Sequence, residues 1–275
     1  MYGVVTRNAE ELDWPEFDRG FYEVKDVTGR HTDPVPGGVN MVSCFGDTAT
    51  AETEPDLVPV DDEGNPATRD RPYFDWGYVC PTADNYKNGL LEVIEACTIA
   101  NEDVRLDDVG FPRDEYCHCE RCEDAFASSD YDDWHEWRAS VITEFVADAR
   151  EKIPGKLYFT LYPDPYPGHL YERAGLDIEA LSEYVDEFVV PLYDTNYGTT
   201  YWLETIASGF ESLLDTAFSI ELYAVDVDID NLIHAAEVAD AYGNDVFFGY
   251  HAGNARAALR RIDAETRDGV EFGAE

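Results

Sequence analysis

The sequence predicts an α/β fold, a single (β/α)8 TIM barrel over residues 1–275. Three observations predict it: eight short runs of β-branched and aromatic residues, amphipathic helical patterns in most gaps between them, and a length that suits one barrel. Strands that alternate with helices through short connections form a parallel sheet, and eight such units close it. An open doubly wound sheet is the alternative fold, and two small domains are the alternative organisation.

The predicted strands are the eight apolar runs in the chain. They cover residues 2–6, 39–45, 73–80, 104–110, 156–162, 187–193, 217–225 and 245–251. A polar segment from Thr48 to Arg71, rich in Pro, Asp and Glu, follows the second run. It predicts a long loop that walls the active face of the barrel.

Helices are predicted in the gaps between these strands. They cover residues 84–99, 131–153, 177–185, 199–214, 230–242 and 254–267. The clearest is 131–153, in which six apolar residues form one stripe at helical spacing: Trp134, Trp137, Val141, Phe145, Ala149 and Ile153. Asn254 is the predicted N-terminal cap of the last helix.

The charge of the chain excludes several classes of partner. The 59 acidic residues against 19 basic ones give a formal net charge of -40. Because nucleic acids and anionic membranes would be repelled, we expect neither as a partner. Since the acids are spread along the whole chain, they predict a solvated shell suited to the concentrated salt of a halophile. No Gly-rich phosphate loop follows a predicted strand, so we expect no nucleotide cofactor.

The N-terminal stretch and the cysteines indicate a compartment. MYGVVTRNAEEL has neither a basic leader nor a signal-length apolar stretch, and no segment reaches the ~18 apolar residues of a membrane span. We therefore expect a cytoplasmic protein. Six cysteines, three of them clustered, fit a reducing compartment in which thiols bind metal or are buried. Cys44 in a strand and Cys97 on an apolar helix side are expected in the core.

The sequence CHCERC, residues 117–122, predicts a structural zinc site in the loop after the fourth predicted strand. A C-x-C-x2-C spacing lets one tight loop place Cys117, Cys119 and Cys122 around a single ion. Cys80, which ends the third predicted strand, is the expected fourth ligand, and His118 is the competing one. Three free thiols and a disulfide are the alternatives. Four thiolates form a closed site, which would brace the loop and not activate water.

The stretch CPTADNYKNGLLEVIEACTIANEDVRLDDVGFPRDEYCHCERCEDAF resembles glycoside hydrolase-like barrel families related to the α-amylase and α-galactosidase type of (β/α)8 enzymes. In those families a CP pair, a helix, a fourth strand with an LD pair and a C-x-C-x2-C…F loop follow one another. The matching residues here are Cys80, Pro81, Leu106, Asp107, Phe111, Pro112, Cys117, Cys119, Cys122 and Phe126. GLDIEALSEYVDEFVVPLYD is similar to their sixth strand and the helix before it, with Tyr193 and Asp194 at the strand end.

The resemblance covers about residues 73–195 and implies a carbohydrate-related barrel, here of a halophilic archaeal type. Two departures stand out. Val104-Arg105 replaces the usual Gly-Ile or Gly-Phe before the LD pair, and no residue matches the acid of the fifth strand.

Acidic residues close several predicted strands, at the end of a barrel where catalysis takes place. Glycosidic cleavage needs two carboxyl groups that flank the bond, one protonated and one ionised. The resemblance aligns Asp107 with the fourth-strand aspartate, which implies a nucleophile or charge stabiliser; pairing with Arg105 or Arg113 is the alternative. Strand alternation predicts that Asp107 and Asp108 point to opposite faces.

Two further acids are catalytic candidates. Glu221 lies in an apolar run, where desolvation would raise its pKa as a general acid requires; a buried ion pair is the alternative. Asp194 closes the sixth predicted strand, where a carboxylate also caps turns.

Candidate substrate-binding residues lie at the same strand ends. Because sugars present flat apolar faces edged by hydroxyls, aromatic rings beside polar groups suit them, with ordinary packing as the alternative. The candidates are Trp76, Arg105, Tyr162, Tyr193 and His251. The expected ligand is a small molecule or an oligosaccharide. The alternatives to a glycosidase are a non-catalytic barrel that binds a saccharide or protein, and a zinc hydrolase.

Overall fold

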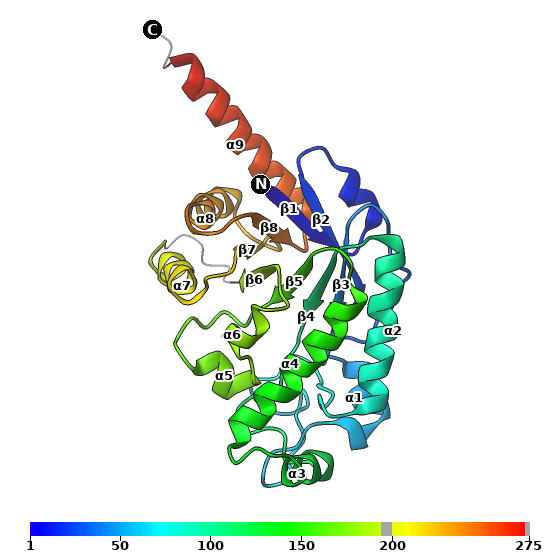
Figure 1. Ribbon diagram of the computed structural model, residues 1–275. Coiled ribbons are helices and arrows are strands. Elements are labelled where there is room, and N and C mark those ends of the chain that lie inside the picture. Colours follow the sequence, from blue (N-terminus) through cyan, green and yellow to red (C-terminus); the bar gives the residue numbers. More distant parts are fainter. Residues whose placement is uncertain (194–199, 273–275) are drawn as a thin grey trace.

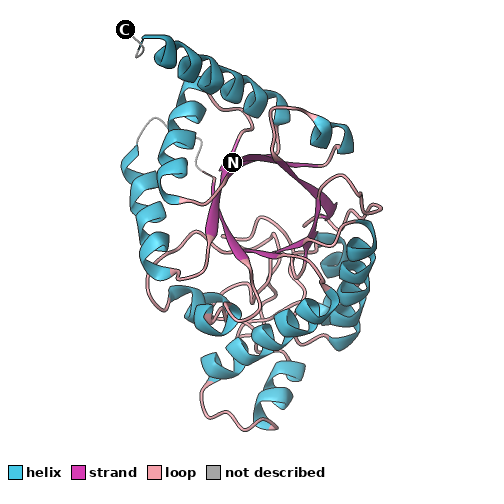
Figure 2. Cartoon of the chain, turned by 45° about the horizontal axis from the view of Figure 1, so that its top comes forward, coloured by secondary structure: helices cyan, strands magenta, loops and turns pink. Residues whose placement is uncertain are grey.

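The computed structural model describes residues 1–193 and 200–272. It contains a closed barrel of eight parallel strands in chain order, which confirms the predicted (β/α)8 fold. Figure 2 shows the strands as a ring with the helices outside it. The strands are β1 Tyr2–Thr6, β2 Arg19–Lys25, β3 Val39–Ser43, β4 Val104–Asp107, β5 Leu157–Thr160, β6 Glu187–Leu192, β7 Phe218–Tyr223 and β8 Val246–Gly249.

Helices cover the outside of the barrel and extend into its loops. They are η1 Ala9–Asp13, α1 Thr48–Thr53, η2 Pro55–Leu57, α2 Asp84–Ala100, α3 Glu120–Ala127, α4 Trp134–Lys152, α5 His169–Ala174, α6 Ile178–Leu181, α7 Thr200–Leu213, α8 Ile229–Tyr242 and α9 Ala252–Phe272. Asp133 caps α4 and Asp228 caps α8, each by accepting a backbone N–H of the first turn. No helix in the described part of the chain is both long and apolar enough to cross a membrane.

The third predicted strand was wrong, and a different segment takes its place. Residues 73–80 form no strand and lie in the long loop after β3, so Cys80 does not end a strand. Its aromatic residues pack within that loop, where the ring centres of Phe74 and Tyr78 lie 5.4 Å apart. The missed strand is β2, RGFYEVK, whose charged residues Glu23 and Lys25 are buried at the end of the barrel and conceal the strand pattern.

The boundary predicted for the last helix was also wrong. Helix α9 begins at Ala252 and includes Asn254, whose side-chain amide donates to the carbonyl of Ala224. Figure 1 shows α9 projecting past the end of the barrel at which the N-terminus lies. The predicted burial of Cys44 and Cys97 is confirmed.

The barrel interior holds its own apolar cluster, separate from the larger core between strands and helices. Its buried members are Val5, Phe21, Val39, Met41, Tyr158, Val189 and Phe247. Glu23 and Glu221 are buried in the second halves of their strands, and Arg105, from the first half of β4, extends its buried guanidinium to Glu221 and Asp107. The barrel is therefore filled by apolar residues in its middle and by charged residues at one end, which we call the barrel mouth.

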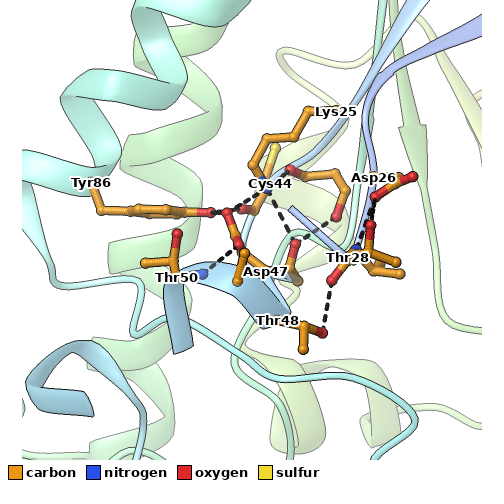
Figure 3. A network of polar contacts seen from close by, with 12 residues as sticks. Lys25, Asp26, Thr28, Cys44, Asp47, Thr48, Thr50 and Tyr86 are labelled. Atoms are coloured by element: carbon orange, nitrogen blue, oxygen red, sulfur yellow. Dashed lines mark hydrogen bonds and ion pairs between the residues drawn. The ribbon is translucent and has the colours of Figure 1, made fainter. Parts of the chain in front are cut away.

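A polar network around Lys25 joins the loops after β2 and β3 to α2 (Figure 3). The buried Lys25 ammonium lies 3.1 Å from the Asp47 carboxylate and donates to the carbonyl of Ser43 at 2.9 Å. Asp47 also accepts from the hydroxyl of Tyr86 at 3.0 Å and caps α1 through the Thr50 N–H at 2.9 Å. These bonds satisfy a buried charge and hold two loops of the mouth against α2.

Candidate functional site

Four carboxylates from three strands meet at the barrel mouth: Glu23 of β2, Asp107 and Asp108 at the end of β4, and Glu221 of β7. We call them the acid cluster. Neighbouring members raise the pKa of Glu23, Asp108 and Glu221, in each case after the larger effect of burial.

Arg105 connects two members of the acid cluster. Its guanidinium is fully buried, with Nη2 2.5 Å from Oε2 of Glu221 and 3.7 Å from Oδ2 of Asp107. Its Nε donates to the hydroxyl of Thr160 at 2.9 Å. Burial disfavours the charge of Arg105, but Glu221 and Asp107 outweigh it, so the pKa of Arg105 is raised above its ordinary value. Arg105 therefore supplies positive charge to β4 and β7 together.

Glu221 is enclosed on every side. Its Oε1 accepts from the hydroxyl of Tyr193, its Oε2 pairs with Arg105, and the side chain has no exposed surface. Burial raises its pKa, and Arg105 and Tyr193 offset part of that rise. A Cβ atom on Gly249 would lie only 2.6 Å from Oε1, so the neighbouring strand needs glycine there. The buried ion pair, one of the two interpretations of Glu221, is what the structure shows; a catalytic role stays a prediction.

Asp107 and Asp108 lie at the same end of the barrel. The backbone of Asp108 is left-handed, with φ of +50°, so strand alternation stops at Asp107 and the predicted opposite orientation does not follow. Ser43 is the register partner of Asp107, and its hydroxyl donates to Asp108 at 2.6 Å. Burial and the neighbouring Asp107 carboxylate raise the pKa of Asp108 to about 8. Asp107 retains 19% side-chain exposure.

The predicted aromatic residues lie near these acids or at neighbouring strand ends. A Cβ atom on Gly46 would lie 3.0 Å from Nε1 of Trp76 and 3.1 Å from Cγ of Asp108, which places the indole beside that acid. Tyr193 is 42% exposed and Tyr162 48% exposed, the latter with the Arg173 guanidinium 3.9 Å from its ring centre. These rings could contact a ligand bound at the mouth.

The remaining predicted residues have other positions. His251 is exposed, and its Nδ1 accepts the N–H of Asn254 at 3.0 Å, which makes it a cap of α9. Asp194 lies outside the described residues.

Sequence reasoning missed Glu23 and Arg7. Glu23 is 4% exposed, pairs with Arg7, and has a raised pKa because of burial. The sequence signal for Glu23 was a strand pattern. Phe21 and Glu23 alternate with Tyr22 and Val24, which is typical of a strand that presents one pair to each side of the sheet.

A second site comprises the four predicted metal ligands. The Sγ atoms of Cys80, Cys117, Cys119 and Cys122 all lie within 4.8 Å of one another. Sγ of Cys80 lies 3.4 Å from that of Cys122 and 3.8 Å from that of Cys119. Metal–sulfur bonds of ~2.3 Å in a tetrahedron require sulfur–sulfur distances of about 3.8 Å. The four thiols therefore fit one metal ion.

The chemistry around the four cysteines also fits a metal. Thr82 places its hydroxyl 3.1 Å from Sγ of Cys80 and 3.3 Å from Sγ of Cys122, where it can donate to thiolates. His118 is not part of the group, because its Nδ1 lies 2.6 Å from Glu123 and its ring stacks on Trp134. Cys80 arrives from the long loop after β3, so the site joins that loop to the loop after β4.

Comparisons with known proteins identify the fold. No family model and no curated protein sequence matches the chain. Among solved structures, the chain is similar to the PgaB (BpsB) glycoside hydrolase domain from Bordetella bronchiseptica, with a TM-score of 0.69 and 10% identity over 96% of this chain and 97% of that one.

A second similar structure is alpha-L-fucosidase isoenzyme 2 from Paenibacillus thiaminolyticus, with a TM-score of 0.63 and 14% identity over 94% of this chain. The chain covers 46% of that fucosidase, which is under half its length. At these identities the likeness shows the barrel fold, and both neighbours are named as glycoside-cleaving proteins.

Proposed function

We propose that this protein is a glycoside hydrolase-like enzyme that cleaves a saccharide with acids of the barrel mouth. The observation that carries the proposal is the Asp107–Asp108 pair. Burial and Asp107 raise the pKa of Asp108 to about 8, so Asp108 holds a proton at neutral pH. Asp107 lies 3.7 Å from the Arg105 guanidinium, so a positive charge stands beside this second carboxyl group. One protonated and one ionised carboxyl group are the requirement of glycosidic cleavage.

The proposed roles follow from these environments. Asp108 donates its proton to the leaving oxygen, and Asp107 stabilises the positive charge that develops on the sugar or attacks it as a nucleophile. Glu221 is the other candidate for the acid; its full burial favours the role of orienting Arg105 against Asp107. Trp76, Tyr162 and Tyr193 offer flat rings to the sugar. The two glycoside-cleaving structural neighbours support this class of substrate.

The test is a screen of chromogenic glycosides in molar salt with the wild-type chain and Asp108→Asn. Loss of a general acid lowers kcat by about 10²–10⁴-fold. Asp148→Asn is the matched control, because Asp148 is exposed on α4 and outside the acid cluster. An Asp108→Asn variant as active as the control would refute the assignment of the acid.

A non-catalytic saccharide-binding barrel is the second candidate. The buried Arg105–Glu221 ion pair favours it, because both groups are occupied within the protein. This candidate predicts sugar binding without turnover, which calorimetry and product analysis on the same panel distinguish from hydrolysis.

We further infer that the four-cysteine site holds a structural zinc ion. Cys80, Cys117, Cys119 and Cys122 would supply all four ligands, so the site would be closed and would brace two loops. Metal analysis should find one zinc per chain, and Cys119→Ser should lose it. Cys97→Ser is the control, since Cys97 is a buried thiol outside the site. A wild-type chain without zinc would refute the inference.

A further inference from the structure

A hollow of about 130 Å³ lies between the loop after β3 and the loop after β4. Its apolar wall includes Phe74 and Tyr116, two buried rings in edge contact at 5.6 Å. Two arginines and two acids contribute the polar part: Arg71, Arg113, Asp61 and Glu115. The hollow has room for about four water molecules at ~30 Å³ each, which is less than a whole sugar unit and enough for the hydroxyl edge of one.

Tyr73 lines this hollow with an open aromatic ring. Its side chain is 81% exposed, and the Arg113 guanidinium lies 4.9 Å from the centre of its ring. Arg113 covers only part of the ring, because the side chain of Tyr73 stays largely exposed. The exposed part of the ring is a surface on which a ligand can stack. The backbone of Tyr73 is left-handed, with φ of +84°, an uncommon conformation for an aromatic residue. A flat ring beside hydrogen-bonding groups matches the apolar face and hydroxyl edge of a sugar.

The walls of the hollow are tied together by the four-cysteine site. Tyr116 directly precedes the ligand Cys117, and the N–H of His118 donates to the carbonyl of Val60 at 2.7 Å. On the other wall, the N–H of Cys80 donates to the carbonyl of Leu57 at 2.8 Å. A hollow whose two loops share one metal site is preorganised for a ligand.

The same two loops carry the groups of the barrel mouth. Trp76 comes three residues after Tyr73, and Arg113 comes five residues after Asp108. The mouth and the hollow therefore share the same two loops, and an oligosaccharide bound at both would run along them.

The charges of the hollow indicate a neutral ligand. Arg71 lies 3.0 Å from Asp61 and Arg113 lies 3.5 Å from Glu115, so each arginine already has an acidic partner. The net charge of -40 repels polyanionic saccharides as a whole.

We propose that this hollow is a distal subsite for a neutral oligosaccharide, with Tyr73 as its stacking platform. The subsite rests on the proposed function, in that the unit cleaved at Asp107 and Asp108 occupies the mouth while a more remote unit places its hydroxyl edge in the hollow. The substrate is accordingly an oligosaccharide and not a monosaccharide derivative.

The test is calorimetric binding of neutral cello-, malto-, manno- and chito-oligosaccharides, from two to six units, to the full chain. Affinity in one series should rise with length, and Tyr73→Ala should weaken the longer members about five-fold while leaving the disaccharide unchanged. Tyr73→Phe should retain wild-type binding, because the ring remains. Ile99→Ala is the control, since Ile99 is 85% exposed on α2 and far from the hollow along the chain.

Equal binding of all lengths, or equal binding by Tyr73→Ala and wild type, overturns the subsite. Hydrolysis with no effect of Tyr73→Ala refutes the subsite alone, whereas length-dependent binding without any hydrolysis refutes the proposed catalysis alone. Failure of every oligosaccharide to bind refutes both.

Discussion

Arg105 of β4 and Glu221 of β7 form a fully buried ion pair, with 2.5 Å between Nη2 and Oε2. The two residues are 116 positions apart in the chain, and the closed barrel places them face to face. Asp107 lies 3.7 Å from the same guanidinium. The pair therefore lies directly beside an acid proposed to act on substrate.

Glu221→Gln should lower the free energy of unfolding by about 3 kcal/mol, because it leaves a buried guanidinium with only the more distant Asp107. Denaturant titration measures this loss. Glu211→Gln, on the exposed face of α7, should change stability little. The double variant Arg105→Met/Glu221→Leu should recover part of the stability without activity, and a fully stable Glu221→Gln would contradict the assigned pairing.

The pH dependence of activity should follow Asp108. As a proton donor with a pKa of about 8, it works below that pH and loses function as pH rises through it. The Ser43 hydroxyl stabilises the ionised form and lowers this pKa, so Ser43→Ala should move the alkaline limb of kcat/KM to higher pH. An unmoved limb in this variant would argue against Asp108 as the donor.

The raised pKa of Asp108 also predicts that the stability of the protein depends on pH. The folded-state pKa of Asp108 lies above its ordinary value of 3.8, so its contribution to stability is fully present below about pH 4 and is lost as pH rises through about 8. Denaturation at several pH values should show wild type losing stability relative to Asp108→Asn across this window. If the curves of stability against pH run parallel for wild type and Asp108→Asn, the raised pKa of Asp108 is contradicted.

Thr82→Val should weaken metal binding about ten-fold, because the hydroxyl beside Cys80 and Cys122 can no longer donate to their sulfurs. Competition with a chromophoric chelator measures the affinity. Thr98→Val on α2 is the control, since the Thr98 hydroxyl donates to the carbonyl of Glu95 and not to sulfur. Equal affinities for the two variants would remove Thr82 from the site.

Gly249→Ala should destabilise the chain by about 1–3 kcal/mol, because its methyl group would lie 2.6 Å from Glu221 and 3.3 Å from the Tyr193 hydroxyl. Gly37→Ala is the matched control, since a methyl group there meets nothing within 4 Å. Thermal denaturation compares the two. A harmless Gly249→Ala would show that the Glu221 environment has room to rearrange.

The sequence predicted the barrel because hydrophobic periodicity is local, and seven of the eight strand segments were recognisable from their apolar runs alone. β2 was missed because Glu23 and Lys25 look like surface residues until a barrel mouth surrounds them with partners. Residues 73–80 were mistaken for a strand because aromatic residues packed within a loop give the same pattern as a buried strand.

The cysteine group shows which metal ligands the spacing of residues in the sequence can identify. The C-x-C-x2-C run indicated three ligands because a tight loop brings neighbouring residues to one point. The structure joins Cys80 to them, as expected, although from a loop and not from a strand end.

By itself, the sequence determined the α/β alternation, the net charge of -40 and the grouping of Cys117, Cys119 and Cys122, since each depends on composition or on residues near one another in the chain. Only the tertiary structure decided that Glu221 pairs with Arg105, that Asp108 turns back toward Ser43, and that Tyr73 borders a hollow. The physical reason is that pKa values and ion pairs depend on burial and on distances across the barrel, which strand closure sets and linear spacing does not.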